Sequence, residues 1–261
     1  DVYTKEPLST DSPLLSMDEI ICTPHLGAST EEAQEKVAVD VANQIVDFLK
    51  NGNVRNAVNM PSIDADSLKK IQPYLKLGED LGVFIAELLN DPLTGIEIQY
   101  NGEVAEQRMD PITISILKGL LTRNIEGINM VNAPFIAKDR GIKVKESKST
   151  EVHEYTSTIQ VTAKTKKGER SVTGSVFGKG DSRIVKFDEF NFEAVLSKHM
   201  LVLNNTDVPG VIGKMGNVLG VNEINIAGFH LGRVKEGGKA VAIINVDSAP
   251  TKKTIHDRRG R

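Results

Sequence analysis

Near the start of the chain a short apolar run gives way to a strongly patterned helix, and this change constrains the fold more than any other feature. Residues 20–22 are Ile-Ile-Cys, an apolar run typical of buried parallel strands, so the sequence predicts a strand over 18–22. Residues 29–32 have the pattern of a capping box, in which Ser29 accepts a hydrogen bond from the Glu32 amide and Glu32 reaches back. A helix is therefore expected to begin at Ser29.

The helix that begins at Ser29 has one apolar face. Its apolar residues recur at steps of three and four, as on one side of a helix, and they are Ala33, Val37, Val41, Ala42, Ile45, Phe48 and Leu49. A connector follows and is stopped by Pro61, where we place a domain boundary. The first 60 residues thus divide into 1–28, which end in the loop before the helix, and 29–60, the helix with its connector.

Two further units follow the boundary. Residues 61–197 alternate between helical and strand patterns and form an expected α+β domain, with helices at 68–89 and 111–121 and from 131, and strands at 96–100, 154–164, 170–176 and 183–187. Residues 198–261 read as strand, helix, strand, strand, with strands at 200–203, 224–231 and 240–246 and a helix from Pro209 to Leu219. This order is the first two-thirds of a ferredoxin-like βαββαβ unit. Only a charged tail follows Pro250. The expected fold class is a multidomain chain with α/β and α+β parts.

The bulk composition excludes several classes of partner. The formal net charge is −3, which gives no electrostatic reason to expect nucleic acid or an anionic membrane as partner. No apolar segment approaches the roughly 18 residues of a membrane span. Cys22 is the only cysteine, so an intrachain disulfide is impossible and a reducing, cytoplasmic setting fits best. The histidines are not clustered in a way that suits a metal, so we expect no metal site.

His25 and Glu6 are the first candidates for chemistry. An imidazole suits proton transfer near neutral pH, and a paired carboxylate would fix its tautomer and stabilise its charged form. The two residues lie 19 positions apart. On spacing alone, a histidine that caps a loop is the simpler interpretation, and both interpretations remain open at this point.

Two other groups of polar residues have a functional and a structural interpretation. Residues 204–213, together with 223–227, place amide and carboxylate groups beside a helix N-terminus, where they could bind a small zwitterion. The alternative is a helix cap with a turn. Basic residues in the middle unit, among them Arg140 and Arg183, form either an anion site or a solvated face.

Residues 22–33, Cys-Thr-Pro-His-Leu-Gly-Ala-Ser-Thr-Glu-Glu-Ala, resemble the catalytic-histidine signature of the D-isomer-specific 2-hydroxyacid dehydrogenases. Residues 1–7 are similar to that family's segment with the glutamate partner, and the resemblance extends to about Pro250. It is strongest to the long form of the enzyme that oxidises 3-phosphoglycerate with NAD in serine synthesis. The resemblance implies that His25 takes the proton from the C2 hydroxyl while hydride passes to NAD, and that Glu6 orients His25.

The same resemblance assigns a domain to each part of the chain. It implies the end of a Rossmann-type nucleotide-binding domain over 1–28, a substrate-domain helix over 29–60, an intervening domain over 61–197 and a truncated ACT domain over 198–261. The chain has no Gly-x-Gly-x-x-Gly loop to hold a pyrophosphate. The family's substrate arginine would also precede Asp1. By this interpretation most cofactor contacts lie before Asp1, with possible contributions from His25 and Gly27, and the fragment itself is inactive.

Regulation is the other implication of the resemblance. ACT domains of this family bind L-serine between paired copies, and Asn205, Asp207 and Asn225 fall on the effector positions. The intervening domain implies an anionic effector, with Arg140 and Arg183 as candidates, and the family implies a homo-oligomer. Two alternatives stay open: a regulatory, amino-acid-binding fragment without catalysis, and another D-2-hydroxyacid dehydrogenase that acts on glyoxylate or hydroxypyruvate.

Overall fold

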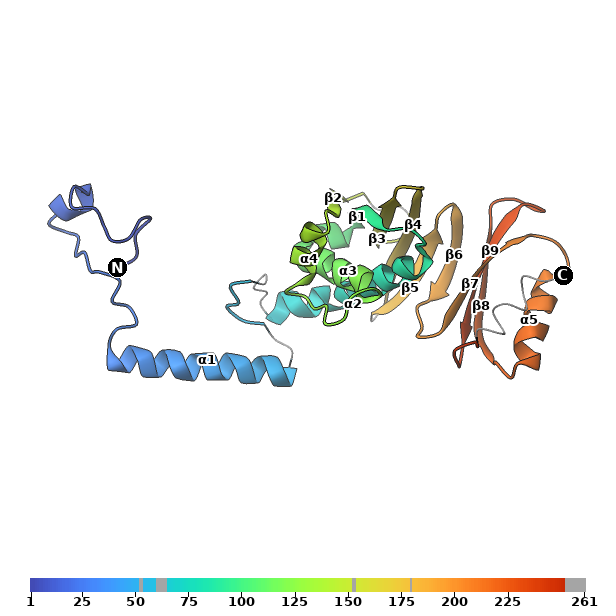
Figure 1. Ribbon diagram of the computed structural model, residues 1–261, viewed down its shortest axis with the longest axis horizontal. Coiled ribbons are helices and arrows are strands. Elements are labelled where there is room, and N and C mark those ends of the chain that lie inside the picture. Colours follow the sequence, from blue (N-terminus) through green and yellow to red (C-terminus); the bar gives the residue numbers. More distant parts are fainter. Residues whose placement is uncertain (52–53, 60–64, 152–153, 179, 252–261) are drawn as a thin grey trace. The chain divides into compact units, whose positions relative to one another are not determined.

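The computed structural model describes residues 1–51, 54–59, 65–151, 154–178 and 180–251 (Figure 1). Contacts divide the chain into two compact units, Asp1–Ala65 and Asp66–Arg261, which are treated separately below. The predicted boundary at residue 61 and most of the charged tail lie outside the described residues. No helix of the described part is long and apolar enough to cross a membrane.

The described residues of the first unit contain one short 3-10 helix, η1 (Pro13–Ser16), and one long helix, α1 (Glu31–Asn51). The predicted strand over 18–22 is wrong, because this segment is irregular and the side chain of Ile21 is 88% exposed. An apolar run of three residues forms a strand only beside a neighbouring strand. The described residues of this unit contain no strand that could pair with it.

The N-terminal cap of α1 differs from the prediction by one residue. Thr30 is the cap, since its Oγ1 accepts a hydrogen bond from the Ala33 amide at 3.2 Å. The prediction that Ser29 accepts from Glu32 is therefore wrong. Both residues carry hydroxyls, and the turn closed by the Ser29 amide on the Leu26 carbonyl at 2.9 Å leaves Ser29 outside the helix.

The second unit is built on a six-stranded sheet with the order β2-β1-β3-β4-β5-β6. β1 pairs with β2 in parallel, and all other pairs are antiparallel. The strands are β1 (Leu93–Gly102), β2 (Lys143–Ser149), β3 (Ser157–Thr165), β4 (Glu169–Phe177), β5 (Asp181–Phe187) and β6 (Phe190–Val195). The four strands predicted here are present near their expected places. β2 and β6 were not predicted, because β2 is an exposed polar edge strand and β6 is short.

In the described part of the chain, three α-helices and a short 3-10 helix precede or connect the strands of this sheet. They are α2 (Ala65–Leu88), η2 (Glu103–Glu106), α3 (Asp110–Thr122) and α4 (Ala133–Asp139). α2 packs on β4, where a Cβ on Gly174 would lie 2.6 Å from the Leu77 side chain. α2 and α3 approach each other closely at two glycines. A Cβ on Gly82 would lie 2.3 Å from the Ile116 carbonyl oxygen, and one on Gly119 would lie 2.2 Å from the Glu79 carbonyl oxygen.

A three-stranded antiparallel sheet with the order β7-β9-β8 follows, and one helix accompanies it. The elements are β7 (Met200–Thr206), α5 (Val211–Val221), β8 (Ile226–Arg233) and β9 (Lys239–Val246), in the predicted order of strand, helix, strand, strand. The helix begins after Pro209 rather than at it, because Gly210 has φ 89°, a left-handed conformation that a helix does not contain.

Both faces of the three-stranded sheet are covered (Figure 1). On one face, Ala242 and Ile244 share a core with Leu219 of α5. On the other face, Val241 and Ile243 belong to the core of the six-stranded sheet. The Nδ2 of Asn245 donates from this second face to the Val195 carbonyl at 2.7 Å and to the Ser197 hydroxyl at 2.8 Å, which ties β9 to the end of β6.

Candidate active site

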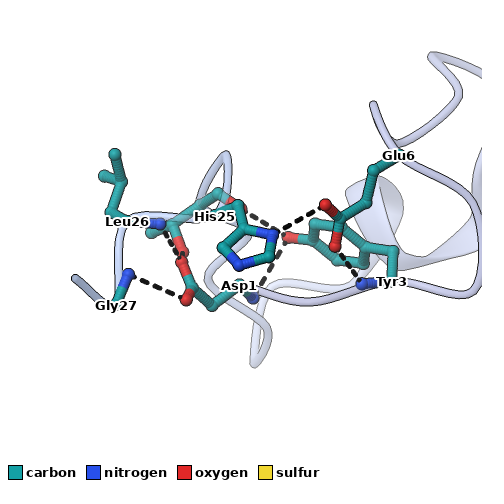
Figure 2. A network of polar contacts seen from close by, with 7 residues as sticks. Asp1, Tyr3, Glu6, His25, Leu26 and Gly27 are labelled. Carbon is teal, nitrogen blue, oxygen red and sulfur yellow. Dashed lines mark hydrogen bonds and ion pairs between the residues drawn. The ribbon is translucent and has the colours of Figure 1, made fainter. Parts of the chain in front are cut away.

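Glu6 and His25 lie in contact in the loops before α1 (Figure 2). The Nδ1 of His25 is 2.7 Å from the Oε2 of Glu6. The other carboxylate oxygen, Oε1, accepts a hydrogen bond from the Tyr3 amide at 3.0 Å. Residues 19 positions apart are thus brought together, and the backbone of Tyr3 fixes the orientation of the carboxylate.

The geometry decides which ring nitrogen of His25 exchanges protons. An ionised carboxylate only accepts hydrogen bonds, so the Nδ1 of His25 is the donor to Glu6 and Nε2 is left for proton transfer. The hydrogen bond from His25, followed by that from the Tyr3 amide, holds the pKa of Glu6 below its ordinary value. Glu6 is therefore ionised at neutral pH and can stabilise a positive charge on His25.

The His25 backbone has an unusual conformation. Its φ is 58°, in the left-handed region that few residues other than glycine adopt. The side chain is 59% exposed and borders a cavity of about 450 Å³. Tyr3, Pro7, Leu8, Leu15 and Cys22 are among the other residues that line this cavity. The imidazole is thus accessible from an open pocket with a mixed apolar and polar wall.

Two residues of this site were not identified from the sequence. The carboxylate of Asp1 accepts hydrogen bonds from the Thr23 hydroxyl at 2.9 Å, from the Gly27 amide at 3.0 Å and from the Leu26 amide. The Tyr3 hydroxyl donates to the Thr23 carbonyl at 3.0 Å. The only sequence signal was their place a few residues before Glu6, since a contact across 20 or more positions leaves no periodic pattern.

The described residues offer few groups that could bind a dinucleotide cofactor. The amide of Gly27, a predicted cofactor contact, is bonded to Asp1. The sequence holds no Gly-x-Gly-x-x-Gly loop for a pyrophosphate. The described residues therefore supply an acid–base pair and no phosphate cradle. They also contain no group of three or more His, Cys, Asp or Glu that could hold a metal ion.

The three residues predicted to bind an effector do not meet within one chain. Asn205 pairs with Ala240 on β9, and Asp207 follows at the same end, where its carboxylate is 2.7 Å from Nη1 of Arg233. Asn225 lies at the other end of β9, where its Nδ2 donates to the Asp247 carboxylate at 2.7 Å. The seven steps from residue 240 to residue 247 span about 23 Å in a strand.

The two predicted anion-binding arginines also lie apart. Arg183 is on β5, where its guanidinium bonds Asp181 at 2.7 Å and Glu193 at 3.0 Å and stacks 5.0 Å from the Phe177 ring. Arg140 caps the C-terminal end of α4 and borders a cavity of about 480 Å³, and Arg183 does not line that cavity.

Comparison with known proteins gives the same family for most of the chain. Residues 70–188 match the D-3-phosphoglycerate dehydrogenase intervening domain. D-3-phosphoglycerate dehydrogenase of Synechocystis sp. is 40% identical over 249 residues, which are 95% of this chain and 45% of that protein. The enzyme of Archaeoglobus fulgidus is 37% identical, over 98% of this chain and 49% of that protein. The chloroplastic D-3-phosphoglycerate dehydrogenase 3 of Arabidopsis thaliana is 31% identical, over 98% of this chain and 46% of that protein.

The chain spans about half the length of the curated relatives it matches. The similarity extends well beyond the intervening domain, because the aligned residues make up 95% to 98% of this chain. Residues 70–188 thus match an intervening domain, and almost the whole chain is similar to about half of several D-3-phosphoglycerate dehydrogenases.

Proposed function

We propose that Glu6 and His25 are the acid–base pair of an enzyme that oxidises 3-phosphoglycerate to 3-phosphohydroxypyruvate, the first step of L-serine biosynthesis, with NAD as cofactor. The observation that carries this proposal is the 2.7 Å contact between the two side chains, with His25 exposed at an open cavity. A histidine that only capped a loop would need neither the carboxylate nor the access.

The pair can perform the proton half of the reaction. Nε2 of His25 accepts the proton of the C2 hydroxyl, and the Glu6 carboxylate at 2.7 Å stabilises the imidazolium that forms. The C2–H bond breaks as hydride while the C2–O bond becomes a carbonyl, and NAD, when bound, accepts this hydride. In the reverse direction His25 returns the proton. The 261 residues contain no pyrophosphate loop, so we infer that this chain alone is inactive.

The test is an assay of NADH formation from 3-phosphoglycerate with the protein expressed from its complete open reading frame. His25→Asn is the informative variant, because asparagine accepts a left-handed φ and changes only the side chain. We expect kcat to fall by about 10²- to 10⁴-fold, as for the loss of a general acid–base group. His199→Asn in the second unit is the matched control and should keep the wild-type rate. Retained activity in His25→Asn would exclude the proposed role.

The choice of substrate rests on the intervening domain. A family member acting on glyoxylate or hydroxypyruvate is the alternative enzyme, and the match of residues 70–188 favours 3-phosphoglycerate. An assay in the reverse direction, which follows NADH consumption with 3-phosphohydroxypyruvate, glyoxylate or hydroxypyruvate, separates the two, since the ratio of the kcat/KM values reports the specificity of the site. A higher kcat/KM for glyoxylate or hydroxypyruvate than for 3-phosphohydroxypyruvate would favour the alternative.

We also propose that the C-terminal sheet is an ACT-like domain that binds L-serine between two copies of the chain, in a cytoplasmic homo-oligomer. Two observations support this. In the described part of the chain, Oδ1 of Asn205 is buried without a hydrogen-bond partner. Asn225 lies about 23 Å along the strand from Asn205 and Asp207, so a second copy is needed to bring the three together.

Calorimetry with L-serine tests this regulatory proposal on the 261-residue chain. Asn225→Ala should abolish binding, and D-serine is the control ligand. Binding should be accompanied by dimerisation in sedimentation experiments, because the site is shared. Serine binding to a monomer would contradict the shared site. Serine binding by a complete protein that has no dehydrogenase activity would favour a regulatory protein without catalysis.

A further inference from the structure

We propose that the cavity between α2 and the start of β7 binds a small monocarboxylate with an apolar body, of the branched aliphatic or phenyl-bearing kind. The cavity has a volume of about 680 Å³, which is within the usual range for small-molecule sites. It lies where the helices of the six-stranded sheet meet the three-stranded sheet. The proposal is independent of the proposed dehydrogenase activity, because no residue of the candidate active site takes part.

One wall of the cavity is a side of α2 that the core of the second unit leaves open. The core side of this helix carries Leu77, Leu81 and Ile85, which are fully buried. The neighbouring side borders the cavity, with residues at steps of three and four: Lys76, Asp80, Val83, Phe84, Glu87 and Leu88. Val83 on this side is 40% exposed, so an aliphatic surface faces the open cavity.

The opposite wall is formed by the connector from β6 to β7 and by the start of β7. Met200 and Val202 line the cavity and pack against the core of the six-stranded sheet. On the neighbouring strand β9, Val241 and Ile243 pack into the same core and are fully buried, whereas Met200 and Val202 are only half-buried. The packing between the two sheets is therefore complete at β9 and incomplete at β7, where the cavity lies.

The charged groups of the cavity favour an anionic end on the ligand. Asp80 is paired with Lys76, whose Nζ is 2.6 Å from Oδ2. The Oε2 of Glu87 is 3.6 Å from Nε of Arg123. Lys198 also lines the cavity, is exposed, and takes part in none of the ion pairs among the described residues. Both carboxylates thus have a cationic partner, and the ammonium group of Lys198 is left to bind an acid.

This arrangement of charge also limits the ligand to a single carboxylate. One unpaired cation can neutralise one negative charge, and a second charge beside the apolar walls would lose its hydration without a partner. A phosphorylated metabolite is therefore disfavoured. The ammonium group of a free amino acid would be repelled by Lys198. The class that remains is a monocarboxylate whose apolar body contacts Val83, Met200 and Val202.

Occupation of the cavity would strengthen the junction between the two sheets. The connector that carries Lys198 is already tied to β9, because Nδ2 of Asn245 donates to the Val195 carbonyl at 2.7 Å and to the Ser197 hydroxyl at 2.8 Å. A carboxylate held by Lys198, with its body against α2, would join that helix to the connector and to β7. Binding should therefore slow amide exchange in β7.

The first experiment uses 3-phenylpropionate as the probe and 3-phenylpropanamide, which has the same shape and no charge, as the matched ligand. Binding is followed by NMR on the 261-residue chain with labelled methionine methyl groups, and the Met200 signal is identified by its loss in Met200→Leu. We expect a saturable shift of this signal with a Kd on the order of 1 mM, and about fivefold weaker binding of the amide. No saturable shift at about tenfold this concentration, or equal affinity for both ligands, would overturn the proposal.

Variants test the two walls separately. Lys198→Met keeps the aliphatic stem and removes the charge, so it should weaken binding of the acid about fivefold and leave that of the amide unchanged. Lys186→Met is the matched control, because Lys186 is an exposed lysine of β5 outside the cavity. Val83→Trp should abolish binding of both ligands, because the larger side chain fills the cavity from a partly exposed position. Equal weakening by the two lysine variants, or wild-type binding by Val83→Trp, would place the ligand elsewhere and refute the proposal.

A third measurement separates this cavity from the proposed serine site. Excess L-serine should not displace 3-phenylpropionate, because Asn205, Asp207 and Asn225 do not line the cavity. Amide exchange in β7 should become slower when the probe is saturating. Displacement by L-serine, or unchanged exchange in β7, would contradict a separate site at this junction.

Discussion

Gly82→Ala tests the close approach of α2 and α3, which determines the core of the intervening domain. In the middle of a helix this change alone would be favourable by about 1 kcal/mol, because alanine has the higher helix propensity. Here the new Cβ would lie 2.3 Å from the Ile116 carbonyl oxygen and 2.9 Å from the Leu120 amide nitrogen. Both neighbours are backbone atoms of α3, so neither can rotate away.

The size of the effect follows from the displacement that this contact requires. Side-chain Cβ atoms rarely approach within 3.0 Å, so the helices must separate locally by about 0.7 Å. A gap of 0.5–1 Å removes roughly a quarter to a half of the dispersion energy of the affected contacts, and overpacking typically costs about 1–3 kcal/mol. Because the clash is with backbone atoms, we expect a cost in the upper part of this range, about 2–3 kcal/mol. After subtraction of about 1 kcal/mol for the helix propensity, the net loss is about 1–2 kcal/mol. For a unit of this size that lowers Tm by about 2–8 °C.

Urea unfolding followed by circular dichroism measures the change in the free energy of unfolding. The matched control is Gly216→Ala in α5, where a new Cβ has nothing within 4 Å. That variant should be more stable than wild type, by about 0.5–1 kcal/mol. The two identical changes are thus expected to have opposite signs. A Gly82→Ala protein as stable as Gly216→Ala would refute the described packing of α2 on α3.

Two further predictions concern the first unit. The pKa of Glu6 is lowered by the hydrogen bond from His25, so the pair contributes stability above the ordinary glutamate value of 4.5 that is lost as the pH falls through the lower folded-state pKa. NMR titration of the Glu6 carboxyl should show this midpoint, and His25→Ala should move it back towards 4.5, whereas no movement would contradict the pairing. Thr30→Ala should destabilise the start of α1 by about 1 kcal/mol through loss of the cap. Ser29→Ala should leave the stability of the start of α1 nearly unchanged. Amide exchange of Ala33 measures both effects, and faster exchange in Ser29→Ala than in Thr30→Ala would contradict the assignment of Thr30 as the cap.

The sequence predicted an element correctly where that element has a strong pattern of apolar residues of its own. The alternation of Ile96, Ile98 and Tyr100 predicted β1, and all three side chains are at most 1% exposed. β2 was missed because the pattern Lys-Val-Lys-Glu-Ser-Lys-Ser has no buried face, and its strand conformation depends on pairing with β1. The predicted strand at 18–22 failed for the converse reason, since an apolar pattern without a partner strand does not make a sheet.

The candidate site was predicted only through the family resemblance. Glu6 and His25 are 19 positions apart in irregular loops, and no periodicity relates two such residues. Asp1 was missed because two of the three donors to its carboxylate are backbone amides, which are the same for every residue type. The separation of Asn225 from Asn205 depends on the register of β9 against its neighbours, which the sequence pattern does not specify.

The burial of β9 has a consequence for how the C-terminal part of the chain can be used. From Ala240 to Ile244 no residue is more than 1% exposed, because α5 covers one face of the strand and the six-stranded sheet covers the other. Expression of residues 198–261 on their own would expose Val241 and Ile243 to water and leave Asn245 without the acceptors of Val195 and Ser197. The C-terminal sheet is therefore not expected to fold as a separate module, and a fusion that tests the proposed serine control on another enzyme would have to include the six-stranded sheet as well.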